Sequence, residues 1–170
     1  MRKANFIVGF SNWGKSYLIN HLYGKTIFHN SNLHHLDNSN IKQGFIVHPQ
    51  SNDDLGRDYI IQIDKRLKVY KPQRADLFST ICPATEKRYN WLEIIQDKRI
   101  DSFKEFNLFL LKYKWDHHAE LKIEEVKASL GENENINYYI IDQGERCELT
   151  ARLEVKLQQI IRHPEDIYNP

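Results

Sequence analysis

A short segment near the N-terminus combines the residue types that bind phosphate. Two glycines five positions apart are followed by a lysine and a serine, and the segment reads Gly9-Phe10-Ser11-Asn12-Trp13-Gly14-Lys15-Ser16. Glycines let a backbone curl so that successive N–H groups point inward at phosphate oxygens. The Lys15 ammonium would reach the β- and γ-phosphates of a nucleotide, and the Ser16 hydroxyl would bind Mg²⁺. We therefore expect Lys15 to act in catalysis and Ser16 to act as a metal ligand.

The spacing of these residues is the Walker A signature. It follows an apolar run at 5–8 and precedes a pattern in which Leu18, Ile19 and Leu22 recur at helical spacing. A strand, a glycine-containing loop and a helix in this order form the context that phosphate binding requires. We expect residues 9–17, from Gly9 through Tyr17, to bind ATP or GTP together with Mg²⁺, helped by the positive end of the helix.

Short apolar runs alternate with amphipathic patterns along the rest of the chain. We expect strands at 5–8, 26–28, 45–48, 77–82 and 138–141. We expect helices at 15–24, about 53–67, 85–98, 102–114 and 118–130, and a last helix from 149 that ends at Pro164. Asp53 or Asp54 would cap the second helix. This alternation predicts an α/β fold in which a five-stranded parallel sheet is covered on both faces, a three-layer sandwich.

Length and charge restrict the class of protein further. The chain has 170 residues, which fits one domain, and a formal net charge of +1. Because 24 basic side chains nearly balance 23 acidic ones, we expect neither nucleic acid nor a membrane surface as a partner. The two cysteines, Cys82 and Cys147, suggest reduced thiols and a cytoplasmic protein.

The phosphate loop and two later segments together resemble the P-loop kinases of small molecules, a superfamily of nucleoside, nucleotide and metabolite kinases. The run at 74–88 looks like a strand leading into a lid helix, and the run at 137–143 is similar to the last strand of such kinases. The resemblance extends from Ala4 to about Ile161. It implies a single P-loop kinase-like domain over residues 1–170 that transfers phosphate from ATP to a small-molecule acceptor.

The resemblance also implies roles for individual residues. Arg88, or else Arg99, would stabilise charge on the transferring phosphoryl group. Asp53 or Asp54 would hold the water shell of Mg²⁺ or accept the acceptor's proton, although both follow the third expected strand several residues later than in the family. A group after the second expected strand would bind the acceptor: His29, Asn30, His34 and Asp37.

The alternative to a kinase is a regulatory or structural module that binds ATP or GTP without transferring phosphate, which the late carboxylates favour. We expect Asp142, despite its place after an apolar strand, not to be a metal-binding acid, because its strand is the last and lies at the sheet edge. Gln143 would lie near the nucleobase.

Overall fold

The computed structural model covers most of the chain. It describes residues 2–70, 75–85, 90–114, 119–142 and 149–168. Two residues with expected roles, Arg88 and Gln143, lie outside the described residues. The side chains of 149–151 also lie outside the description.

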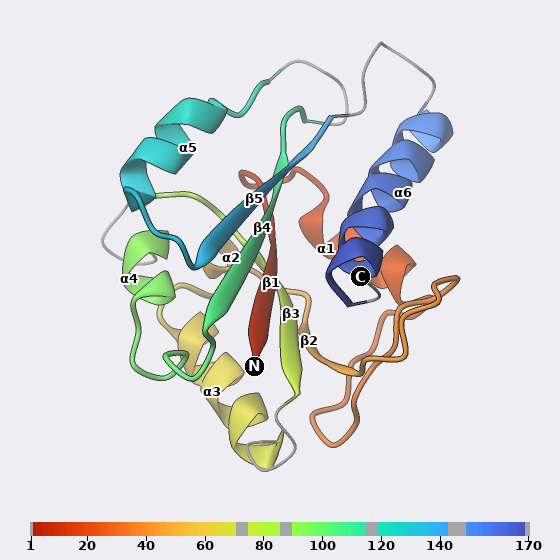
Figure 1. Ribbon diagram of the computed structural model, residues 1–170, viewed down its shortest axis with the longest axis vertical. Coiled ribbons are helices and arrows are strands. Elements are labelled where there is room, and N and C mark those ends of the chain that lie inside the picture. Colours follow the sequence, from red (N-terminus) through yellow and green to blue (C-terminus); the bar gives the residue numbers. More distant parts are fainter. Residues whose placement is uncertain (1, 71–74, 86–89, 115–118, 143–148, 169–170) are drawn as a thin grey trace.

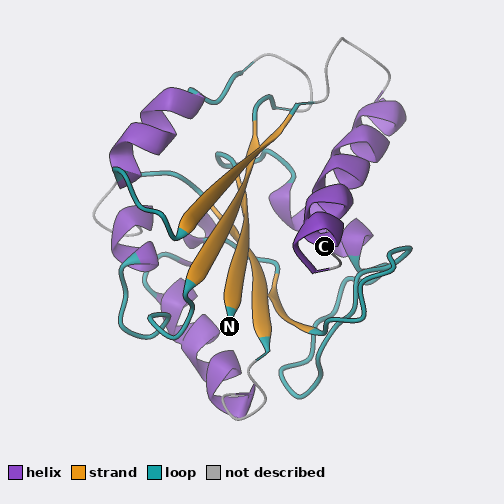
Figure 2. Ribbon diagram, in the orientation of Figure 1, coloured by secondary structure: helices purple, strands orange, loops and turns teal. Residues whose placement is uncertain are grey.

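A five-stranded, all-parallel sheet forms the centre of the molecule (Figure 2). Its strands are β1 (Lys3–Val8), β2 (Phe45–His48), β3 (Asp76–Ile81), β4 (Glu105–Leu111) and β5 (Ile136–Ile141). Their order across the sheet is β2-β3-β1-β4-β5. The expected α/β class and the five-stranded parallel sheet are therefore confirmed.

Helices lie on both faces of this sheet. They are α1 (Lys15–Leu22), α2 (Asn52–Leu55), α3 (Asp58–Tyr70), α4 (Trp91–Ile95), α5 (Ile123–Leu130) and α6 (Leu149–Tyr168). Figure 1 shows α1 and α6 on one face and α3, α4 and α5 on the other, which is compatible with a three-layer sandwich. In the part of the chain that the structure describes, no helix has both the length and the apolar character needed to cross a membrane.

The topology creates a crevice at the carboxyl ends of the central strands. The chain leaves β1 toward β2 on one side, whereas it leaves β3 toward β4 on the other side of β1. In open parallel sheets, ligands bind where neighbouring connections diverge in this way. The loop that follows β1 therefore occupies the position at which a ligand is expected.

A ladder of three asparagines, Asn5, Asn107 and Asn137, crosses the middle of the sheet on adjacent strands in one register. The Asn107 side-chain amide donates to the side-chain oxygen of Asn5 at 3.0 Å. The Asn137 side-chain amide donates to the side-chain oxygen of Asn107 at 3.1 Å. Asn5 in turn donates to the backbone carbonyl of Leu77 in β3 at 3.0 Å. Because buried amides must be paired, a slip of any of these strands would leave polar atoms without partners.

The end of α6 closes on the same strands. Tyr168 donates its hydroxyl proton to Asp76 at 2.7 Å and accepts a hydrogen bond from Asn5 at 3.3 Å. The helix continues through Pro164, so the expectation that Pro164 ends it is wrong. A proline removes one backbone donor from a helix, and here the contacts of Tyr168 stabilise the turn beyond it.

The segment at 102–114 is the main error of the sequence interpretation, because its centre forms β4 instead of a helix. All residues of β4 after Glu105 are buried, since β4 lies between β1 and β5 and helices cover both of its faces. A continuous apolar run of this kind lacks the alternation that distinguishes a strand from a buried helix. Three of its aromatic residues, Phe103, Phe106 and Phe109, belong to the core.

The expected strand at 26–28 is also wrong, because these residues form a loop. Phe28 is buried against Tyr23, but Ile27 is exposed, and the Phe28 carbonyl accepts from the Arg66 side chain at 3.0 Å instead of from a neighbouring strand. The helix expected at 53–67 is divided at Gly56 into α2 and α3.

The remaining expected helices are shorter than the sequence suggests. Where 85–98 was expected to be helical, the described helix is α4, capped by Asn90, whose side chain accepts from the Leu92 amide. Where 118–130 was expected, the described helix is α5.

The buried histidine of β2 predicts a pH dependence of stability. Burial, and secondarily the charge of Arg66, lower the pKa of His48 from 6.5 to about 3, and neither ring nitrogen has a partner among the described residues. The folded state therefore favours the neutral ring, so this contribution is complete above pH 6.5 and is lost as the pH falls toward 3. We expect a loss of about 2 kcal/mol between pH 7 and pH 5.

Urea denaturation of the wild type and of His48→Gln at several pH values measures this loss, because the difference between the two proteins isolates the histidine. Parallel pH profiles for the two proteins would contradict the assignment.

Candidate functional site

The start of the loop between β1 and α1 is fixed to the end of β3. The Gly9 amide donates to the Ile81 carbonyl at the end of β3 at 3.2 Å. A Cβ atom on Gly9 would lie 3.2 Å from Leu111 and 3.3 Å from the Trp13 ring, so a larger residue would require these side chains to shift. Gly14 has a φ of +77°, which only glycine adopts without strain. The structure therefore explains why glycine occupies both positions of the motif.

Lys15 is the first residue of α1, and its side chain is 5% exposed. Its Nζ donates to the Phe10 carbonyl at 2.9 Å and lies 3.6 Å from the Asp53 carboxylate. The latter distance indicates charge attraction and not a hydrogen bond. Because an ammonium has three N–H donors, this arrangement keeps donors available for an anion.

Ser16 is oriented by the chain that follows β2. Its hydroxyl donates to the Pro49 carbonyl at 2.7 Å, and the Thr80 hydroxyl donates to the same carbonyl at 3.0 Å. A hydroxyl that donates its proton in this way keeps its lone pairs for another partner. The Ser16 oxygen is thus set as an acceptor or a metal ligand.

The short helix α2 brings a carboxylate into the site. Ser51 and Asp54 form a capping box at its start, in which the Ser51 amide donates to Asp54 at 3.1 Å. Ser51 is therefore the cap, and neither Asp53 nor Asp54 takes the cap position that we expected. Asp53 instead turns toward Lys15 and accepts from the Ser51 hydroxyl.

Asn52 fixes α2 to the end of β3. It is fully buried, donates to the Cys82 carbonyl at 3.0 Å and accepts from the Cys82 amide at 2.6 Å. This pair of bonds resembles the pairing of a strand and holds the backbone beside Asp53. Burial, together with the negative charge of Asp53, raises the pKa of the Cys82 thiol to about 11, so it remains protonated at neutral pH.

These groups line an open cleft of about 170 Å³. The residues around it come from the loop, from α1 and from the start of α2: Asn12, Trp13, Gly14, Lys15, Ser16, Tyr17, Ser51, Asp53 and Asp54. Among the described residues, no side chain caps α1, and its first turn carries no acidic residue, so the N–H groups of that turn can meet an anion. The cleft therefore combines a cation, backbone donors and two oxygen ligands.

The oxygen ligands fit Mg²⁺ better than a softer metal. Among the described residues no group of three or more His, Cys, Asp or Glu side chains is arranged to hold a metal ion. Mg²⁺, however, commonly uses one or two protein oxygens and takes the rest from phosphate and water. The Ser16 hydroxyl and the Asp53 carboxylate are oxygen groups of this kind, and both line the cleft.

Most of the expected site residues meet at this cleft. Residues 12–17 and Asp53 line it, whereas Gly9, Phe10 and Ser11 do not. Phe10 instead lines a second cleft on the other side of the loop. Trp13 is buried and packs edge-on against Phe10.

Other expected residues lie elsewhere. Arg99 is paired with Asp97 through two side-chain bonds of 2.8 and 2.6 Å in the turn before β4. The residues at 29–37 that were expected to bind the phosphoryl acceptor lie at the amino end of β2. His34 forms a β-bridge with Phe45 there, and the Asp37 backbone amide donates to the end of α1. β5 is an edge strand with β4 between it and β1, as expected, and Asp142 pairs with Lys112 at 2.8 Å.

Three residues of the site were missed in the sequence. The Pro49 carbonyl is a backbone group, and the Asn52 side chain bonds to backbone groups, so neither contact has a sequence signature. Ser51 did carry a signal, because a serine followed three residues later by an acid is the pattern of a capping box.

Comparisons with protein-family models, with curated proteins and with solved structures find no match to this chain. The chemistry of the site is therefore inferred from its own residues.

The contacts of Asn52 lead to a prediction about stability. In Asn52→Ala the Cys82 amide and carbonyl lose their partners inside the protein, so we expect a decrease of about 2–4 kcal/mol in the free energy of unfolding. Asn90→Ala removes only a helix cap, and we expect a decrease of about 1 kcal/mol. Urea denaturation of both variants checks the ranking, and equal losses would mean that the Asn52 clamp contributes no more than an ordinary cap.

Proposed function

We propose that this protein binds ATP or GTP with Mg²⁺ at the phosphate loop and transfers the γ-phosphoryl group to a small-molecule acceptor. The observation that carries the proposal is the pairing of Lys15 with Asp53 inside the cleft. The carboxylate that follows β2 late in the sequence turns back to the phosphate loop. A basic group for the phosphates and an acidic group for the acceptor thus lie side by side.

The binding step follows from the charges of the site. A buried ammonium is costly unless it is paired well, and at 3.6 Å the Asp53 carboxylate pairs it only by charge attraction. Phosphate oxygens would complete its coordination, and the backbone N–H groups at the start of α1 would bind the same anion. Lys15 would then withdraw charge from the γ-phosphate as it transfers.

The transfer step depends on Asp53 and Ser16. Asp53 would accept the proton of the attacking acceptor group, and its hydrogen bond from Ser51 holds the carboxylate in place. Ser16 would hold Mg²⁺, which, when bound, supplies positive charge to the phosphate oxygens. Most of the catalysis would come from positioning and electrostatics.

A second candidate function is a regulatory module that binds the nucleotide without transferring phosphate. The segment at 102–114, expected to be the helix after the lid helix, forms β4 at its centre. Among the described residues that line the cleft, none is an arginine. Nucleotide binding is common to both candidates, and turnover separates them.

The first test concerns binding. A ligand that binds only the folded loop stabilises it by about 2.7 kcal/mol at a hundred times its Kd, and we expect MgATP or MgGTP to raise Tm by about 5–10 °C. Lys15→Ala should remove most of this shift, whereas Lys25→Ala, an exposed lysine after α1, should keep it. A shift that persists in Lys15→Ala would place the ligand elsewhere.

The second test concerns turnover. With ATP consumption measured over a panel of nucleosides, nucleotides and metabolite alcohols, Asp53→Asn should lower kcat by about a hundredfold or more while the affinity for ATP stays within about threefold. Asp54→Asn is the matched control, because Asp54 serves the helix cap, and its kcat should change by less than about fivefold. Lys15→Ala is the blank. MgATP binding without turnover for any acceptor would favour the regulatory module.

A further inference from the structure

A second cleft, of about 230 Å³, lies on the other side of the phosphate loop. Its walls come from the loop, from the chain after β3, from α4 and from α5: Phe10, Pro83, Thr85, Trp91, Leu121, Lys122, Glu125, Val126 and Ser129. We propose that this ring cleft binds a neutral aromatic or heteroaromatic ring, which belongs to the phosphoryl acceptor. The assignment of the ring to an acceptor rests on the proposed function.

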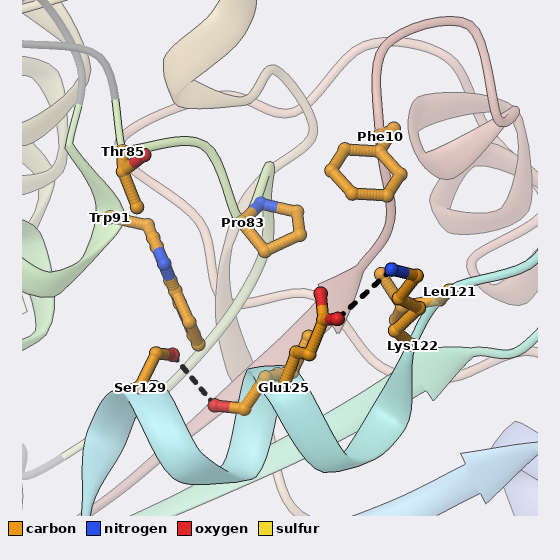
Figure 3. Close-up of a pocket in the computed structure, with 9 residues that line it drawn as sticks. Phe10, Pro83, Thr85, Trp91, Leu121, Lys122, Glu125 and Ser129 are labelled. Carbon is orange, nitrogen blue, oxygen red and sulfur yellow. Dashed lines mark hydrogen bonds and ion pairs between the residues drawn. The ribbon is translucent and has the colours of Figure 1, made fainter.

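Two aromatic side chains define the ring cleft. Figure 3 shows Phe10 on one side, Trp91 on the other, and Pro83 between them. Trp91 is 1% exposed and forms a fixed wall, whereas Phe10 is 41% exposed. A planar ring in the cleft would stack on the exposed face of Phe10, which is favourable beyond the area buried. The buried Trp91 would support the opposite wall.

The polar groups of the ring cleft indicate a neutral ligand. Lys122 and Glu125 pair with one another at 3.0 Å on the exposed side of α5, as Figure 3 shows, and their charges offset each other. The ring cleft therefore offers no net charge to a phosphate chain, unlike the cleft at Lys15. Its rim does offer a donor and an acceptor to the substituents of a ring.

The size of the ring cleft selects a small occupant. Pockets for drug-sized ligands have volumes of about 300–1,000 Å³, and the ring cleft is below that range at about 230 Å³. One ring system fits this volume, whereas a complete nucleotide exceeds it. The nucleotide phosphates and the ring therefore occupy separate clefts.

Phe10 connects the two clefts. Its side chain lines the ring cleft, and its carbonyl accepts the hydrogen bond from Lys15. A ring that packs on Phe10 therefore lies beside the loop that holds the phosphates, which is where an acceptor must lie. Its hydroxyl or amine substituent would point toward the loop.

The test uses neutral aromatic probes of known structure. Binding of nicotinamide, uridine and adenosine is measured by saturation-transfer NMR, with cyclohexanecarboxamide as the non-aromatic control for nicotinamide. We expect at least one aromatic probe to bind about tenfold or more tightly than cyclohexanecarboxamide. Equal binding of the saturated and aromatic rings would overturn the aromatic assignment.

Variants locate the binding. Ser129→Phe fills the ring cleft from α5 and should weaken the probe by about tenfold or more, whereas Ser129→Ala should change it by less than about twofold. Phe10→Ala should weaken it by about fivefold, and Phe10→Tyr should restore it. Ile27→Ala, an exposed apolar residue elsewhere, is the surface control. Binding that is unchanged in both Ser129→Phe and Phe10→Ala would overturn the site.

The source of the ring is decided by adding MgATP. Simultaneous binding of probe and MgATP supports a separate acceptor, whereas displacement of the probe by MgATP, but not by Mg-triphosphate, would assign the ring to the nucleobase and overturn the acceptor. The Tm shift with MgATP in Ser129→Phe is measured in parallel. Probe binding without any response to MgATP would contradict both the proposed function and the acceptor assignment. It would not contradict the ring site itself.

Discussion

The pairing of three amides across the sheet is the constraint on which the site depends. Asn5, Asn107 and Asn137 bond only when β1, β4 and β5 keep one register, and the bond from Asn5 to Leu77 adds β3 to the same alignment. In a parallel sheet, a fixed register also fixes which carboxyl ends lie level with one another. The loop after β1 and the chain after β3 therefore lie level with one another, and their contact is a consequence of polar groups in the middle of the sheet.

The charged part of the site depends in turn on the segment that follows β2. Its backbone is fixed at two points, since Thr80 donates to the Pro49 carbonyl and Asn52 bonds to both backbone groups of Cys82. This rigid segment presents one acceptor to Ser16 and one carboxylate to Lys15. Preorganised groups of this kind lose little freedom when a ligand binds, which is why they are effective in binding and catalysis.

The sequence predicted the parts of the molecule that have local signals. The strand and the helix that flank the glycine motif, and strands β2, β3 and β5, are all short-range patterns, and each occurs where expected. β4 could not be distinguished from a helix because it is buried on both faces and carries no alternation. The return of Asp53 to Lys15 could not be read either, because it depends on a bond between Asn52 and Cys82, two residues that are 30 positions apart.

The contact between Asn5 and Tyr168 has a consequence for the order of events during synthesis. The two residues are 163 positions apart, yet Tyr168 completes the hydrogen bonds of the first strand. At a translation rate of about 5–20 residues per second, Tyr168 is synthesised on the order of ten seconds after β1. The asparagine ladder can therefore form before Tyr168 is synthesised, and the closure of α6 on β1 is the late, long-range step.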